Sequence, residues 1–177
     1  MNSTLHSLVP VRLALAGALF LALGGQPALA DGAKTSTVDL KIGVAITETL
    51  GPGDSAECPY IGQISGSGYS TELGAVEIAA IDCVVPTDAS FTSFAFFTRP
   101  GTFVTVTTRS GGQLFGSYAG TATGAPAPIE SISAKLTISG GNGRYRKASG
   151  TATIEGVENV GTMPAVGVLV ISGKLSY

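Results

Sequence analysis

Residues 38–47 read VDLKIGVAIT, and apolar side chains recur at every second position of this segment. In a β-strand, successive side chains point to opposite faces of the sheet. The alternation therefore places five branched apolar side chains on one face, those of Val38, Leu40, Ile42, Val44 and Ile46. This pattern predicts a strand with one face against a hydrophobic core.

Further segments with strand-like composition follow along the rest of the chain. They are separated by Gly and Pro clusters such as PTDAS at 86–90, RPG at 99–101 and GG at 111–112, which favour turns. Long segments with helical periodicity are absent. The strands expected after the first are residues 60–70, 73–85, 91–98, 102–109, 113–123, 130–139, 150–158 and 166–177.

Short connections without a crossover helix predict an antiparallel barrel or sandwich. Glycines inside the expected strands suit the bends of a strongly curved sheet; they are Gly66, Gly68, Gly116 and Gly120. An immunoglobulin-type sandwich is the competing fold, but the chain lacks Trp and its cysteines are close together, unlike the usual core of that sandwich. We therefore expect an all-β fold, a single antiparallel eight- or nine-stranded barrel.

Residues 1–30 have the pattern of a cleavable signal peptide. A polar start with one cation, Arg12, precedes the apolar run LALAGALFLALGG at 13–25 and the small-residue site Ala28-Leu29-Ala30. A membrane anchor is the alternative, but the run is shorter than the ~20 residues of a spanning helix. We expect cleavage between Ala30 and Asp31, a mature domain at 31–177 without a membrane span, and a secreted or periplasmic location.

The expected mature chain has little chemistry available to it. Cleavage removes Arg12 and the only histidine, His6, which leaves nine cations against twelve anions. A weakly acidic domain without a basic cluster is a poor partner for nucleic acid. Without histidine, the usual nucleophile activation and His-bearing zinc sites are excluded. We predict no metal and no cofactor, and an enzyme would have to use Asp, Glu, Tyr, Lys or Arg.

The two cysteines, Cys58 and Cys83, are both in the mature chain. In an oxidising compartment an even pair is most simply a disulfide, and buried free thiols are the alternative. If residues 60–70 and 73–85 form a hairpin centred near residue 70, the two cysteines are 12 to 13 residues from its centre. That register would bring them side by side, within the Cα separation of about 7 Å that a bridge requires.

The segment at 136–156, LTISGGNGRYRKASGTATIEG, reads as a strand, a tight turn and a returning strand. Gly140, Gly141 and Gly143 permit positive φ angles in such a turn, and Tyr145 and Ala148 can tuck beneath it. Glycines followed by a cation also suggest a phosphate cradle, but the chain lacks the GxxxxGK[ST] motif of a P-loop. A structural turn is the favoured interpretation.

This segment resembles the pattern apolar-x-I-x-G-G-T-G-R-F-x-x-A-x-G-x of allene oxide cyclase-like and dirigent-like β-barrels. Asn142 stands at the usual Thr and Tyr145 at the usual Phe. Residues 66–84, 113–123 and 171–177 are also similar to secreted bacterial relatives of that barrel. The resemblance implies a lumen that handles oily or aromatic small molecules, as plant cyclases isomerise a fatty-acid epoxide and dirigent proteins steer phenoxy-radical coupling. No motif aligns with the catalytic positions of those proteins.

Two acidic residues interrupt the apolar segment at 73–85. Glu77 and Asp82 have opposite parity, so one of them should face the lumen, where a buried carboxylate needs a partner such as Arg99 or Arg109. A paired structural carboxylate is favoured over a catalytic one. Tyr118 can donate a hydrogen bond into the same space. We take Glu77, Asp82 and Tyr118 as candidate ligand-binding residues.

These observations support three functional hypotheses. The leading one is an exported barrel, without catalytic activity, that binds a small apolar or aromatic ligand in its lumen. The second is an isomerase or cyclase of the allene oxide cyclase type, for which a lumenal Glu77, Asp82, Glu155 or Tyr118 would be required. The third is a surface or interaction module, with a homo-oligomer as one form. A lumen filled by side chains, which small barrels also permit, would contradict the first.

Overall fold

The computed structural model describes residues 35–124 and 128–177. The expected leader, residues 1–30, and the expected cleavage site at Ala30–Asp31 lie outside the described residues. Within the described part, no helix is long and apolar enough to cross a membrane.

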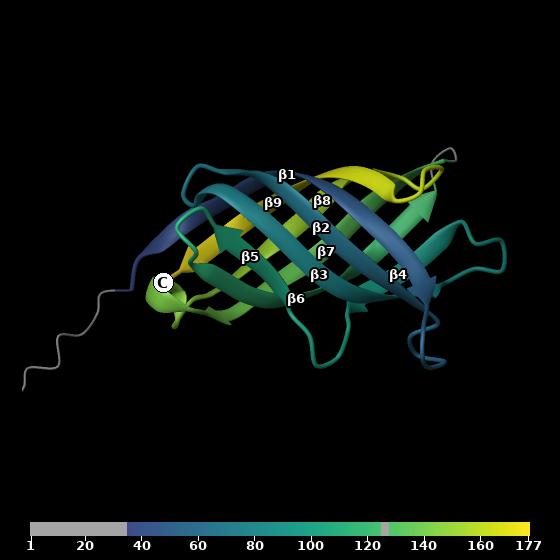
Figure 1. Ribbon diagram of the computed structural model, residues 1–177, viewed down its shortest axis with the longest axis horizontal. Coiled ribbons are helices and arrows are strands. Elements are labelled where there is room, and N and C mark those ends of the chain that lie inside the picture. Colours follow the sequence, from purple (N-terminus) through teal and green to yellow (C-terminus); the bar gives the residue numbers. More distant parts are fainter. Residues whose placement is uncertain (1–34, 125–127) are drawn as a thin grey trace, which may run out of the picture. The chain divides into compact units, whose positions relative to one another are not determined.

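The described chain forms one closed antiparallel β-barrel (Figure 1). Each strand pairs with its neighbours, and β1 closes the ring between β2 and β9. The competing sandwich is thereby excluded. The strands are β1 (Thr37–Pro52), β2 (Tyr60–Ser70), β3 (Gly74–Pro86), β4 (Ser93–Thr98), β5 (Val104–Thr108), β6 (Gln113–Gly124), β7 (Ile129–Gly141), β8 (Ser149–Asn159) and β9 (Ala165–Ser176).

Nine strands occupy eight positions around this barrel, because β4 and β5 share one. Both lie between β3 and β6. β5 pairs with the first part of β3, at Val76–Ala79, and β4 pairs with the last part, at Asp82–Pro86. The break between them falls at Arg99-Pro100-Gly101, as predicted. The expectation of eight or nine strands is confirmed in this sense.

The side chains of β1 alternate between buried and exposed, as its sequence predicts. Leu40, Ile42, Val44 and Ile46 of β1 are at most 6% exposed, while the residues between them are exposed. Glycines on β2 and β6 let neighbouring strands approach closely. A Cβ at Gly68 would lie 2.0 Å from the Gly43 carbonyl oxygen, and one at Gly120 would lie 2.3 Å from that of Ser133. These glycines therefore suit a tightly curved wall, as expected.

One end of the barrel is closed by the turn between β7 and β8. The short 3₁₀ helix η1 (Gly143–Tyr145) places Tyr145 inside at 0% exposure and Ala148 at 3%. The Tyr145 ring meets that of Tyr177 edge-on, with centroids 5.0 Å apart, and the Arg144 guanidinium lies over both rings. The prediction that Tyr145 and Ala148 tuck under this turn is confirmed.

The three glycines of this turn have different roles. Only Gly143 has a positive φ, of 53°, so the prediction of positive φ angles is wrong for Gly140 and Gly141. Gly141 is needed for a close approach, since a Cβ there would lie 2.2 Å from the Gln113 carbonyl oxygen. Gly140 has open space around its Cα.

Two alanine substitutions should separate these roles. Gly143→Ala is expected to lower the free energy of unfolding by about 1 kcal/mol, because an L-residue is strained at positive φ. Gly140→Ala, three residues away with open space and no positive φ, should leave stability unchanged or slightly raised. Urea denaturation of both variants measures the difference, and equal midpoints would contradict the assignment.

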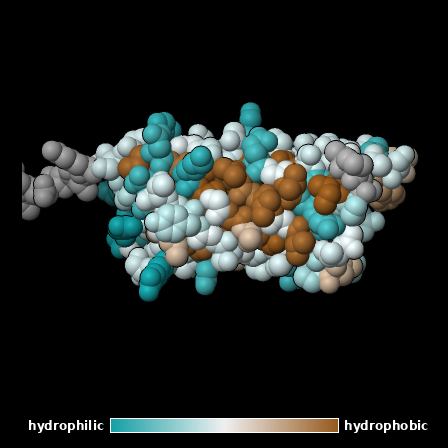
Figure 2. All heavy atoms as spheres, turned by 90° about the horizontal axis from the view of Figure 1, so that it is seen from above, coloured by the Kyte–Doolittle hydropathy of each residue, from teal (hydrophilic) through white to brown (hydrophobic). Residues whose placement is uncertain are grey.

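The outer face of the barrel carries exposed apolar side chains. Figure 2 shows hydrophobic residues gathered on the face seen from above, where Figure 1 places β1, β8 and β9. Two of these strands carry exposed valines, Val157 on β8 and Val166, Val168 and Val170 on β9, which are 42–58% exposed. The homo-oligomer stays a prediction.

Candidate functional site

The lumen is not filled by side chains along its whole length. A cavity of about 340 Å³ occupies the part of the barrel away from the Tyr145 turn. Leu50, Phe91 and Met163 line it and are 42%, 56% and 84% exposed. The cavity therefore opens to solvent between the end of β1 and the loops that carry Phe91 and Met163. Its volume lies within the range of about 300–1,000 Å³ typical of small-molecule pockets.

The other part of the lumen is packed. Leu40, Ile42, Leu114 and Ile138 are at most 5% exposed, and the gap among them and their neighbours measures only about 10 Å³. The cavity is therefore blind at the Tyr145 end and open at the other.

The cavity wall is largely aliphatic and aromatic. β4 contributes Phe94 and Phe96, and the loop before it contributes Phe91. The Phe96 ring packs edge-on against Tyr118, with centroids 5.9 Å apart. Three of the inward positions of β2 are glycines, Gly62, Gly66 and Gly68, so β2 adds little side-chain volume to the lumen besides that of Ile64.

The loop that carries Phe91 is organised by Asp88. Its carboxylate accepts hydrogen bonds from the Ser90 and Thr92 amides at 2.9 and 3.1 Å, and from the Thr92 hydroxyl at 2.8 Å. These bonds lower the pKa of Asp88. Phe91 itself has a φ of 54°, which non-glycine residues rarely adopt. The loop thus holds an aromatic side chain at the mouth in an uncommon backbone conformation.

Asp82 and Tyr118 meet inside the cavity. Asp82 is 2% exposed and Tyr118 is 8% exposed, and the Tyr118 hydroxyl donates a hydrogen bond of 3.0 Å to Asp82 Oδ2. The prediction that one of Glu77 and Asp82 faces the lumen is confirmed for Asp82. Its partner is not an arginine as expected, because Arg99 forms an ion pair with Asp54 instead.

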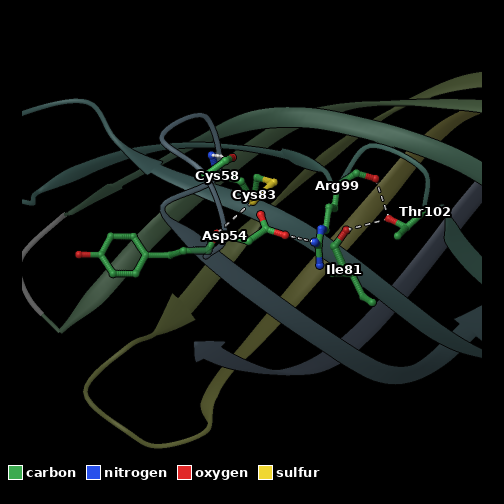
Figure 3. Close-up of a disulfide and its surroundings, with 8 residues drawn as sticks. Asp54, Cys58, Ile81, Cys83, Arg99 and Thr102 are labelled. Carbon is green, nitrogen blue, oxygen red and sulfur yellow. Dashed lines mark hydrogen bonds and ion pairs between the residues drawn. A yellow bond between two sulfur atoms is a disulfide. The ribbon is translucent and has the colours of Figure 1, made fainter. Parts of the chain in front are cut away.

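The ion pair lies beside the disulfide on the outer side of the wall. Figure 3 shows Arg99 reaching Asp54 close to the bridge between Cys58 and Cys83. Since Asp82 points into the lumen, the next residue, Cys83, points outward. It is nevertheless 0% exposed, because the loop carrying Asp54 and Cys58 covers it. The predicted disulfide is confirmed, with Cα atoms 4.9 Å apart.

Three further carboxyl groups line the same cavity, and our sequence reasoning missed them. They are Glu48 on β1, Glu130 on β7 and Glu158 on β8. Glu130 and Glu158 stand directly opposite each other in the register of their strands. A signal was available, because Glu48 continues the inward parity of Leu40 to Ile46 and Glu158 that of Ala152 and Ile154.

Burial dominates the electrostatics of these groups. Desolvation, followed by the nearby charges of Asp82 and Glu158, raises the pKa of Glu48 to about 9. Desolvation also raises the pKa of Asp82 to about 6, although the hydrogen bond from Tyr118 opposes it. Burial raises the pKa of Glu130, Glu158 and Tyr118 in the same way. Each charged form is disfavoured in the apolar cavity.

The remaining predicted residues lie elsewhere. Glu77 and Glu155 are exposed on the outer face of β3 and β8 and do not line the cavity. Glu155 accepts a hydrogen bond of 3.2 Å from the Ser133 hydroxyl on the neighbouring strand. Of the residues proposed from the sequence, the structure therefore brings together Asp82 and Tyr118 only.

Comparisons with known proteins add no family assignment. The sequence matches no protein-family model and no curated protein. Among the described residues, no group of His, Cys, Asp and Glu side chains is arranged to hold a metal ion. The site is thus defined by its geometry: an apolar cavity, open at one end, with Asp82, Tyr118 and three glutamates on its wall.

Proposed function

We propose that this protein is an exported β-barrel that binds a small apolar or aromatic molecule in its lumen. The observation that carries the proposal is the blind cavity of about 340 Å³ with a mostly apolar wall. Apolar surface that stays hydrated in the empty protein gains free energy when a ligand covers it, at about 25 cal/mol per Å². Phe91, Phe94 and Phe96 offer edges and faces for an aromatic guest.

Export is supported by two independent features. The residues before the barrel have the pattern of a signal peptide, and the Cys58–Cys83 disulfide is of a kind that persists in oxidising compartments. We propose a secreted or periplasmic location, where such a barrel would meet its ligand outside the cytoplasm.

Binding can be tested with N-phenyl-1-naphthylamine, a neutral dye whose fluorescence rises in apolar sites. We expect saturable binding to the wild-type protein. Ala122→Trp should weaken it about tenfold or more, because Ala122 lines the cavity and is 5% exposed, so that the indole would occupy the space of the guest.

The matched control is Thr121→Trp, one residue away on the outer face of β6. It adds the same side chain without entering the lumen and should leave the dye affinity unchanged. Equal affinity for the wild-type protein and the Ala122→Trp variant would show that the dye binds outside the cavity and would contradict the proposal.

An isomerase or cyclase of the allene oxide cyclase type is the second candidate. It is favoured by Asp82, a lumenal carboxyl group whose pKa of about 6 suits proton transfer near neutral pH, and by the resemblance of residues 136–156 to that family. The test is the product formed from an unstable fatty-acid allene oxide. A chiral excess that Asp82→Asn abolishes would support this candidate, and a racemic product would exclude it.

A further inference from the structure

The lumen holds more carboxyl groups than a site for a purely apolar molecule needs. Asp82, Glu48, Glu130 and Glu158 all line one cavity. No Lys, Arg or His is among the described residues that line it. Burying a carboxyl group in an apolar site is unfavourable unless a partner offsets the cost, so this part of the structure lacks a counter-charge.

Two of these carboxyl groups have an oxygen without a partner. Asp82 Oδ1 and Glu158 Oε1 are fully buried and have no hydrogen-bond partner among the described residues. Asp82 is 2% and Glu158 is 4% exposed, and both line the cavity. Buried polar atoms are almost always hydrogen-bonded, and a ligand that carries hydrogen-bond donors can supply the partner that these two oxygens lack.

Gly62 makes room for two of the carboxyl groups. A Cβ at Gly62 would lie 2.1 Å from Glu48 Oε1 and 2.2 Å from Asp82 Oδ1. The two carboxyl groups from β1 and β3 therefore converge over a position that has no side chain. The Tyr118 hydroxyl donates to Asp82 Oδ2, whereas Asp82 Oδ1 has no hydrogen-bond partner among the described residues.

We infer that the ligand is an amphiphile whose polar end is a protonated amine, seated between Asp82 and Glu158 with its apolar body along the phenylalanines. This inference rests on the proposed ligand-binding function and specifies its chemistry. An ammonium group has three donors and a positive charge, so it can satisfy both free oxygens and supply the missing counter-charge. A hydroxyl group can donate only one hydrogen bond, and a carboxylate would be repelled.

The inference is tested by titrating octylamine, octanol and octanoate into protein recovered from cells that express the full chain, using isothermal titration calorimetry at pH 7. The three molecules share one apolar body and differ in the polar end. We expect octylamine to bind at least about tenfold more tightly than octanol, as charge-assisted hydrogen bonds are worth more than neutral ones, and octanoate to bind most weakly.

Charge-neutralising variants distinguish the lumen from the general acidity of the protein. Asp82→Asn and Glu158→Gln should each reduce the preference for octylamine over octanol about tenfold. The controls Glu77→Gln and Glu155→Gln remove the same charge from the outer face and should leave the preference unchanged. Circular dichroism spectra confirm that each variant is folded.

The outcomes separate this inference from the proposed function. Equal binding of octylamine and octanol, or a preference that the outer-face variants reduce as much as the lumenal ones, would overturn the amine while leaving a ligand-binding barrel. Tighter binding of octanoate would also overturn it. If neither the naphthylamine dye nor any of the three molecules binds, the proposed function and this inference both fail.

Discussion

Removing the disulfide, with Cys58→Ala and Cys83→Ala together, is expected to lower the free energy of unfolding by about 3 kcal/mol. The bridge joins residues 25 apart in sequence and so restricts the unfolded chain. It also holds the loop between β1 and β2 against the outer wall, where Cys83 is fully buried. Alanine is the appropriate replacement, since a serine at position 83 would bury an unpaired hydroxyl group.

Urea denaturation of the double variant measures this loss, and the intact mass of the native protein should be two hydrogens below that of the reduced chain. Asp54→Asn is the matched control, because it breaks the ion pair with Arg99 on the same loop without touching the bridge. That pair is partly exposed, so its loss should cost no more than about 1 kcal/mol. Unchanged stability of the double variant, or two alkylatable thiols in the native protein, would contradict the prediction.

The cysteine pairing was predictable, but the register that produces it was not. A hairpin centred near residue 70 would pair Cys58 with Cys83 across two strands. In the structure Ser70 stands opposite Gly74, and Cys83 stands opposite Ile61. Cys58 lies in the loop before β2, and this loop folds back so that Cys58 reaches Cys83. The Cys58 amide donates hydrogen bonds to the carbonyl and hydroxyl oxygens of Ser55. The turn at 71–73 carries no residue pattern that sets its length. The alternation of apolar residues in the two strands therefore could not fix the register between β2 and β3.

The barrel itself followed from local patterns. Alternation in β1 identified the buried face correctly, and the Pro and Gly residues at 99–101 marked the break between β4 and β5. β4 and β5 share one position in the barrel because both pair with β3 and β6. Such pairing joins residues far apart in sequence, so no local pattern could reveal it.

The site was predictable only in part for a similar reason. Asp82 and Tyr118 drew attention as polar residues within apolar segments, and they meet as a hydrogen-bonded pair. Glu48 and Glu158 lie near the ends of their strands, where an acidic residue reads as the start of a solvent-exposed loop. Only closure of the barrel brings these strand ends around one cavity. The group of carboxyl side chains that distinguishes this lumen is therefore assembled by the tertiary structure.

The ligand-free protein is expected to lose several kcal/mol of stability as the pH rises from 5 to 9. Glu48 has a pKa of about 9 in the folded chain against an ordinary value of 4.5, and Asp82 has a pKa of about 6 against an ordinary value of 3.8. The folded state therefore binds these protons more tightly than the unfolded state. Their stabilising contribution is complete below the unfolded pKa values and is lost as the pH rises through the folded ones, first for Asp82 and then for Glu48.

Glu48→Gln should flatten this profile, because glutamine keeps the shape of the side chain and cannot ionise. We expect the variant to exceed the wild-type protein in stability by several kcal/mol at pH 9 and to match it closely at pH 5. Urea denaturation at pH 5, 7 and 9 provides the comparison. Glu155→Gln, on the outer face of β8, is the matched control and should follow the wild-type profile. A wild-type stability that rises between pH 5 and 9 would contradict the raised pKa values of Glu48 and Asp82.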